Sequence, residues 1–240
     1  MRALTAAEIL RIWELGQVQH PVDRALTLLA AGSGLLRETL AALSVGQRDA
    51  QLLALRELTF GAALNSFAEC PQCRERLEFA LDTTAIRAPR AQETAFEWAI
   101  ADLVVHFRLP DSRDLAALAG CPNPAEARRL LAQRCVLAVR RQGAAMAGDE
   151  LPEEVMAQLA AHIEACDPQA EVLIDLTCPV CGHRWQALFD IAAFFWTEIG
   201  AQAKRLLRDV HSLASVYHWR EADILALSAV RRRCYLEMVS

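Results

Sequence analysis

The chain has 240 residues and a formal net charge of −5, and 54% of its residues are hydrophobic against 23% charged. This composition predicts a soluble protein with a sizeable core, and it excludes intrinsic disorder and a general attraction to nucleic acid. No stretch reaches the ~18–20 apolar residues that span a bilayer, and the N-terminus lacks the basic and apolar regions of a signal peptide, so we expect a cytoplasmic protein without a membrane partner.

Helix-starting signals occupy the first part of the chain. Thr5 and Glu8 are spaced as a capping box, and Pro21 stands where the first turn of a second helix begins. Ser44 and Gln47 form another capping box before a leucine-rich run. We therefore expect a helical segment over residues 1–65, which contains no recognisable arrangement of catalytic residues.

Two short cysteine turns follow, with 104 residues between them. They read CPQC at residues 70–73 and CPVC at residues 178–181. Each turn aims two thiolates at one point, and two such turns supply the four ligands of a closed tetrahedral zinc site. The sequence therefore predicts one structural zinc per chain, bound by Cys70, Cys73, Cys178 and Cys181.

The cysteines also allow other roles. The two turns can also serve as redox-active pairs or hold an iron–sulfur cluster, and His183 is an alternative ligand that we expect to lie outside the ligand set. Of the eight cysteines, four are isolated: Cys121, Cys135, Cys166 and Cys234. Cys135 and Cys166 fall at helical core spacing and are expected to be small buried hydrophobes. His162 precedes Cys166 by one helical turn, but no third group completes a catalytic arrangement.

Alternating apolar residues flank both turns and indicate strands. They occur at residues 77–81, 172–176 and 185–189, and a further strand is expected over residues 103–109. Between Asp111 and Asp167 the helical pattern returns, with Asp111, Asn123 and Pro152 at helix starts. The plan is that of a zinc ribbon over residues 66–190, split by a helical insertion at about residues 111–168.

The remaining segment, residues 191–240, is expected to be helical. Asp190 is the N-cap of a long helix with one apolar side, and Ser228 caps the last helix. The run Arg231-Arg232-Arg233 is typical of a solvated helix face. The predicted fold class is therefore α+β, mostly α-helical, with a small split zinc-ribbon β-element interrupted by a helical insertion.

Several stretches resemble proteins encoded in contractile injection system and contractile-phage tail clusters, which are described as baseplate proteins or as relatives of the T-even type baseplate hub assembly chaperone. The resemblance lies in SVGQRDA at residues 44–50, FRLP at 107–110, CPVCGHRWQALFDIAAFFW at 178–196, and YHWREADILALSAVRRRCYLEMVS at 217–240. It implies a non-enzymatic factor that assembles a baseplate hub, spike or central tube, either leaving before completion or remaining as a minor component. Its implied partners are hub, spike or tube proteins rather than nucleic acid.

Two other classes of function remain open at this point. A zinc-ribbon nucleic-acid-binding regulator would need a basic surface around the ribbon, whereas an assembly chaperone would need an exposed apolar groove. An enzyme braced by the ribbon would need a pocket with clustered titratable groups. Because the chain carries no glycine-rich phosphate loop, HExxH motif or GxSxG elbow, we expect no enzymatic activity.

Overall fold

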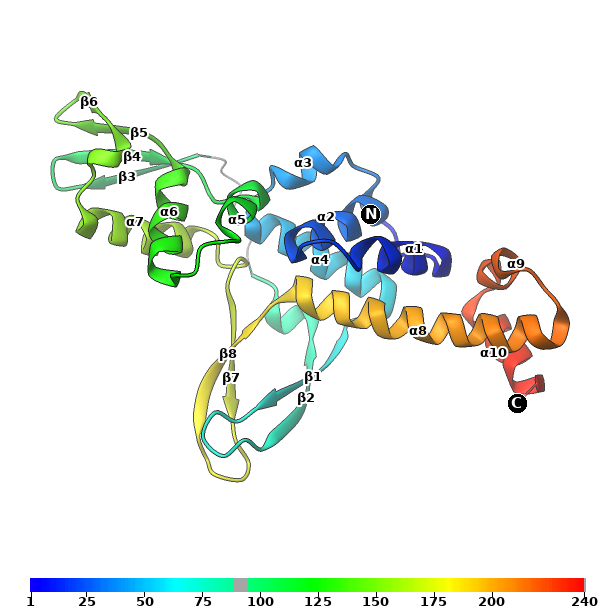
Figure 1. Cartoon of the computed structure of the whole chain (residues 1–240). Coiled ribbons are helices and arrows are strands. Elements are labelled where there is room, and N and C mark those ends of the chain that lie inside the picture. Colours follow the sequence, from blue (N-terminus) through cyan, green and yellow to red (C-terminus); the bar gives the residue numbers. More distant parts are fainter. Residues whose placement is uncertain (89–94, 240) are drawn as a thin grey trace.

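The computed structural model describes residues 1–88 and 95–239, and its elements form an elongated α+β molecule (Figure 1). The described helices are α1 (Ala6–Gly16), α2 (Pro21–Ser33), α3 (Arg37–Ala41), α4 (Val45–Phe60), α5 (Ser112–Leu118), α6 (Pro124–Cys135), α7 (Glu153–Cys166), α8 (Ile191–Tyr217), α9 (Glu221–Ala226) and α10 (Ala229–Val239). The described strands are β1 (Ala63–Glu69), β2 (Arg76–Asp82), β3 (Phe96–Ile100), β4 (Leu103–Phe107), β5 (Val136–Arg141), β6 (Ala144–Met146), β7 (Val172–Thr177) and β8 (Arg184–Phe189). Short 3₁₀ turns occupy Thr83–Ile86 and Gly148–Glu150.

A helical body made of α1 to α4 and the first half of α8 lies at the centre of the molecule (Figure 1). Both capping boxes expected from the sequence are confirmed: Thr5 begins α1 and Ser44 begins α4. The apolar sides of these helices meet in one core, where Phe60 packs edge-on against Phe195 with ring centroids 5.9 Å apart. A nearly buried guanidinium, that of Arg56, crosses from α4 to α8 and bonds Glu198 at 2.6 Å. The body is thus a conventional apolar core with one ion pair tying α4 to α8.

Two β-hairpins project together from this body (Figure 1). β1 pairs antiparallel with β2, β7 pairs antiparallel with β8, and the two hairpins are separate two-stranded sheets. The strands expected at residues 77–81, 172–176 and 185–189 are confirmed as parts of β2, β7 and β8. β1 begins at Ala63, so this strand crosses residue 65, where the sequence suggested the end of the helical segment. Along the hairpin strands every second residue is less exposed than its neighbours. These residues share one face of the hairpin, and that face carries most of the apolar side chains.

Between the hairpins the chain forms a separate module with its own core. Its four-stranded antiparallel sheet has the order β3-β4-β5-β6, and α6 and α7 pack together beside it. Phe107, Cys135 and Leu159 are fully buried in this second core. The helical insertion expected at about residues 111–168 contains α5, α6 and α7, but it also contains the β5–β6 hairpin, which the sequence analysis missed.

A two-residue turn within this range allows the chain to form a hairpin instead of continuing as helix. Gln142 and Gly143 both have positive φ, at 48° and 86°, which is the backbone of the two-residue turn that suits hairpin twist. β5 then completes the sheet by pairing with β4. The strand expected over residues 103–109 also ends earlier, at Phe107, since the chain turns away before Pro110.

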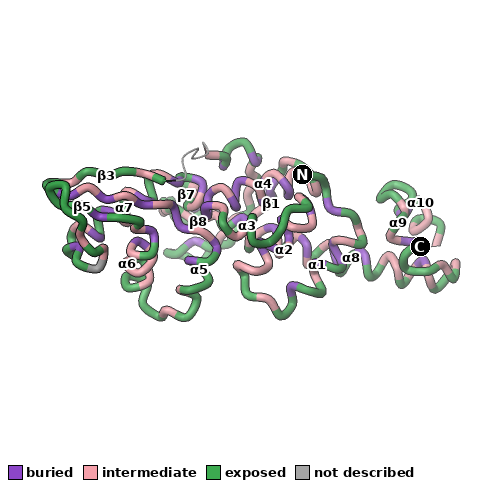
Figure 2. The backbone as a smooth tube through the Cα atoms, turned by 90° about the horizontal axis from the view of Figure 1, so that it is seen from above, coloured by how far each residue is buried: buried purple, intermediate pink, exposed green. Residues whose placement is uncertain are grey.

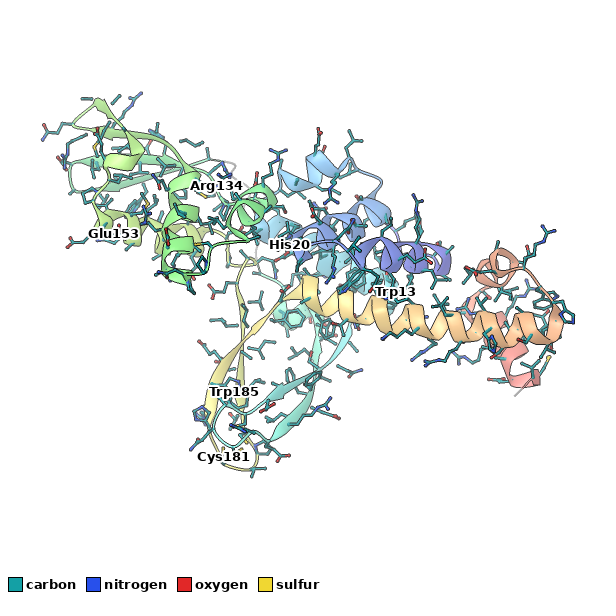
Figure 3. The ribbon with its side chains drawn as sticks, viewed as in Figure 1. Trp13, His20, Arg134, Glu153, Cys181 and Trp185 are labelled. Carbon is teal, nitrogen blue, oxygen red and sulfur yellow. The ribbon has the colours of Figure 1, made fainter. Side chains whose placement is uncertain are left out.

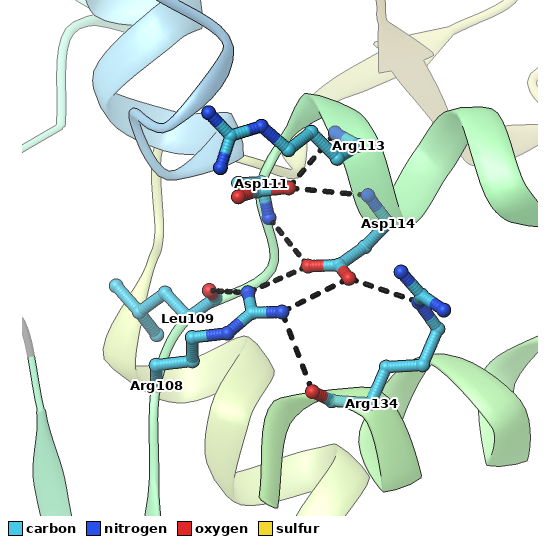
Figure 4. A network of polar contacts seen from close by, with 6 residues as sticks. All are labelled: Arg108, Leu109, Asp111, Arg113, Asp114 and Arg134. Carbon is cyan, nitrogen blue, oxygen red and sulfur yellow. Dashed lines mark hydrogen bonds and ion pairs between the residues drawn. The ribbon is translucent and has the colours of Figure 1, made fainter. Parts of the chain in front are cut away.

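A polar network fixes the start of the module's helical part (Figure 4). The carboxylate of Asp114 is 1% exposed, and it accepts bonds from Arg108 at 2.6 Å, from Arg134 at 2.9 Å and from the Asp111 amide at 3.0 Å. These bonds lower the pKa of Asp114 against its burial, which acts in the opposite direction. The network therefore joins the end of β4, the start of α5 and the end of α6.

The C-terminal end of α8 extends beyond the body and carries α9 and α10 (Figure 1). Burial is concentrated in the body and in the second core, and the C-terminal end is mostly exposed or half-buried (Figure 2). The interpretation of Arg231-Arg232-Arg233 as a fully solvated run was wrong for its middle residue. Arg232 is 6% exposed and bonds Asp209 of α8 at 3.0 Å, so it attaches α10 to α8. None of the described helices combines the length and apolar character required to cross a membrane.

Candidate metal centre

Each cysteine pair lies at the tip of one hairpin, in a turn held by backbone hydrogen bonds. The amide of Cys70 donates to the carbonyl of Glu75 at 2.9 Å, and the amide of Cys178 donates to the carbonyl of His183 at 2.9 Å. The residue that follows the second cysteine of each pair is left-handed, with φ of 62° at Arg74 and 72° at Gly182. The two turns are therefore built alike, although glycine relieves the strain in only one of them.

The structure brings the four predicted ligands together. Their sulfur atoms all lie within 4.8 Å of one another, with Cys70 Sγ 3.7 Å from Cys181 Sγ and Cys73 Sγ 3.6 Å from Cys178 Sγ. Figure 3 places Cys181 at the outer end of the projecting hairpins. Both short approaches join the two hairpins, so the cluster is a contact between segments that are remote in the sequence.

The donor set and its spacing fit a tetrahedral metal. A disulfide requires sulfur atoms about 2.05 Å apart, so neither short approach is a covalent bond. Zinc bound to four thiolates at about 2.3 Å holds its ligands about 3.8 Å apart along each tetrahedral edge, close to the 3.6 and 3.7 Å observed. The residues present therefore fit one four-thiolate metal ion.

The thiols of the cluster differ in pKa. Hydrogen bonds from the Cys181 and Val180 amides lower the pKa of Cys178 to about 7. The pKa of Cys73 rises to about 12, because desolvation and the three neighbouring sulfurs outweigh a hydrogen bond with the Glu75 backbone. Four thiolates this close repel one another, and a divalent cation removes that repulsion.

The surroundings of the cluster are aromatic and nearly neutral. His183 is outside the four-residue cluster, and its ring stacks on Trp185 at 6.0 Å between centroids (Figure 3 labels Trp185). The Arg76 guanidinium lies 4.3 Å from the centre of the Phe67 ring. Acidic and basic side chains are balanced near the tips: Glu69, Glu75 and Glu78 against Arg74, Arg76 and Arg184. This end of the molecule therefore lacks a basic surface.

The other cysteines and His162, which the sequence analysis also considered, lie outside the cysteine cluster. Cys135 is buried in the second core, and desolvation raises the pKa of its thiol to about 12. Cys166 is half-buried at the end of α7. The ring of His162 stacks on Trp98 at 5.5 Å and meets Phe107 edge-on at 5.7 Å. Cys121 is half-buried and Cys234 is exposed.

The left-handed backbone of Arg74 in the first cysteine turn was not predicted from the sequence. Arg74 occupies the position of Gly182 in the second turn, and this correspondence is the signal from which its left-handed backbone could have been inferred. In the part of the chain that the structure describes, no second group of three or more metal-binding side chains occurs.

Comparison with known proteins identifies a family. A family model described as T4 bacteriophage base plate protein matches residues 29–196. This range spans more than half of the chain and includes both cysteine turns, the module between them and the first turns of α8. Neither a curated protein nor a solved structure matches the chain.

Proposed function

Because the chain belongs to the T4 bacteriophage base plate protein family, we propose that it acts as an assembly chaperone or minor baseplate component for the hub or spike of a contractile tail, braced by one structural zinc. The observation that carries this proposal is the family match over residues 29–196, which contains both halves of the cysteine cluster. Its partners would be hub, spike or tube proteins. The role is a binding role and requires no chemistry from the protein.

The zinc would be bound by Cys70, Cys73, Cys178 and Cys181, and its contribution would be structural. A four-thiolate zinc has no open position for water or substrate, so it contributes folding energy rather than Lewis-acid chemistry. The cysteines of the two hairpins would be deprotonated and held at their present spacing. Zinc is favoured over an iron–sulfur cluster or a redox-active pair by the sulfur spacing, which is close to that of a single tetrahedral ion.

Metal analysis tests this part of the proposal. Protein purified under reducing conditions without chelator should contain one zinc per chain, and Cys178→Ser should lose it. Cys234→Ser is the matched control, because Cys234 is exposed on α10 and should leave the zinc content unchanged. Wild-type protein that carries no zinc would refute the assignment, and iron in its place would replace it.

Deleting the gene that encodes this chain, in cells that produce the tail, tests the assembly role. Electron microscopy should find few complete particles, and restoring the wild-type chain should recover them. A yield of complete particles unaffected by the deletion would refute the role. The nucleic-acid regulator considered from the sequence would require salt-sensitive DNA binding, and the balanced charge at the hairpin tips gives it no support.

A further inference from the structure

An apolar groove lies where the inserted module meets the body. It encloses about 380 Å³ between α6, α7, the N-terminus of α4 and strand β8. Its apolar lining includes Val45, Pro110, Leu131, Ile163 and Leu188. Leu188 is 64% exposed although it faces this groove from the hairpin. The groove is therefore an open apolar surface built from three parts of the fold.

The mouth of the groove carries an excess of carboxylates. Glu164 and Glu171 both line the groove and are exposed, and Arg128, the basic side chain of the lining, forms an ion pair with Glu164. The mutual interaction of the two carboxyl groups raises the pKa of Glu171 and lowers that of Glu164. Arg128 therefore neutralises the charge of only one of the two glutamates. A second cation placed at the mouth of the groove would be attracted to Glu171.

Charge is distributed unevenly along the whole molecule. Residues 95–171, which form the module, contain twelve acidic and seven basic residues. Residues 204–239, at the end of α8 and in α9 and α10, contain seven basic and four acidic residues. These two regions lie at opposite ends of the elongated molecule (Figure 1). The protein thus has an acidic module, which supplies part of the groove wall, at one end and a basic segment at the other.

The basic end carries an exposed apolar ridge. Val230, Cys234 and Met238 follow one another at one-turn spacing along α10, so they share a face. All three are exposed, with Val230 at 69% and Met238 at 72%. Arg231 and Arg233 flank this ridge, are exposed, and form no ion pair with any described residue. The opposite face, where Arg232 is buried, attaches α10 to α8.

We propose that the α10 ridge of one chain docks into the groove of a second copy, with Arg231 or Arg233 placed against Glu171. The two surfaces are complementary in both properties: an apolar helix ridge flanked by cations meets an apolar groove with surplus carboxylate at its mouth. A chain cannot fill its own groove, because α10 lies at the far end of α8, on the other side of the helical body from the helices α6 and α7 that line the groove (Figure 1). Such a head-to-tail contact repeats from copy to copy, and it produces a ring if the rotation closes or a filament if it does not.

The contact should depend on ionic strength. Exposed charges are screened beyond about 10 Å at 0.1 M salt and beyond about 3 Å at 1 M. The opposite charges of the two ends steer association, and the flanking arginines set the register of the ridge. Self-association should therefore be strongest in low salt and weaken as salt is added.

The test is the mass of the zinc-loaded, reduced full chain, measured by light scattering and sedimentation at 50 mM and 500 mM salt. The wild-type chain should form species larger than a monomer at 50 mM salt. Glu171→Arg in the groove and Arg231→Glu beside the ridge should each weaken self-association by about tenfold or more. Arg11→Glu on α1 is the matched control, since Arg11 is exposed and lies outside both surfaces, and the substitution changes the net charge by the same amount as Arg231→Glu. It should associate as the wild type does.

Mixing two blocked variants separates this contact from other modes of association. A chain with Met238→Asp and Arg231→Glu keeps an intact groove, and a chain with Glu171→Arg and Leu131→Asp keeps an intact ridge. A one-to-one mixture should stop at a dimer, because one good contact remains. Circular dichroism and melting confirm that each variant is folded. A monomeric wild-type chain at 50 mM salt and about 100 µM, or variants that associate like the wild type, would overturn the proposal and assign the groove to another partner.

Discussion

Removing the metal proposed at the hairpin tips should unfold the tips and spare the helical body. In the outer parts of the hairpins, residues 66–79 and 174–187, the buried residues are Cys70, Leu176 and Cys178. Isolated two-stranded hairpins are marginally stable in water. The cysteine cluster is therefore the main interaction that can hold these tips together.

The magnitudes support this separation. Complete burial of one leucine contributes about 1.5–3 kcal/mol, whereas a structural zinc contributes about 10–16 kcal/mol of apparent binding free energy. The burial of Leu176 thus contributes several times less free energy than binding of the metal would. The body is different, because Leu28, Leu52 and Phe195 are fully buried in a core that no hairpin tip reaches. Loss of the metal should leave that core intact.

Hydrogen exchange distinguishes the two regions. After chelation under reducing conditions, amides of β2 and β7 near the cysteines should exchange at least about tenfold faster, while those of α4 and α8 should keep their protection. Cys178→Ser should reproduce the effect without chelator, and Cys234→Ser should not. The reasoning fails if chelation unfolds the whole chain in one step, or if exchange in β2 and β7 does not change.

Three further substitutions test the polar and backbone features of the fold. Asp114→Asn should destabilise the inserted module by about 3 kcal/mol in urea unfolding, at the lower end of the cost of breaking a buried ion pair because both arginines are partly exposed; an unchanged midpoint would contradict the proposed role of the network. Arg74→Gly should stabilise the first turn by up to about 1 kcal/mol in thermal melts of metal-loaded protein, since it removes a left-handed non-glycine residue, whereas a loss of stability would show that the arginine contributes more than its strain costs. Glu8→Gln tests pH dependence: the Arg2 hydrogen bond lowers the pKa of Glu8 from 4.5 to about 2, so the carboxylate stabilises the fold above about pH 4.5 and this contribution is lost as pH falls towards 2. The difference in unfolding free energy between wild type and Glu8→Gln should accordingly shrink from pH 6 to pH 2, and a constant difference would refute this.

Local signals in the sequence predicted the helix starts and the convergence of the cysteines. A capping box such as that of Thr5 and Glu8 is complete within four residues, so its outcome does not depend on the rest of the fold. The cysteine turns could be paired across 104 residues because four soft ligands have one common chemical use. Both kinds of inference rest on chemistry that the residues carry with them.

Features that depend on a distant partner could not be predicted in this way. Strand β5 follows α6 directly and has a single buried residue, Val139, so its assignment rests on its pairing with β4. Arg232 has exposed arginines on both sides, and its burial depends on Asp209 of another helix. The groove likewise has walls from α4, α6, α7 and β8, which no local pattern places together.

The arrangement of the two hairpins also explains how the fold accommodates a module of this size. At the hairpin bases Gln169 accepts a bond from the Ala88 amide at 2.7 Å and donates to the Ile86 carbonyl at 3.2 Å. At the tips the cysteine cluster joins the same two chain segments. Because the entropic cost of closing a loop grows only with the logarithm of its length, two such attachments keep the hairpins together almost regardless of what lies between them. The module, which has its own core, can therefore supply α6 and α7 to the wall of the apolar groove without taking part in the metal centre.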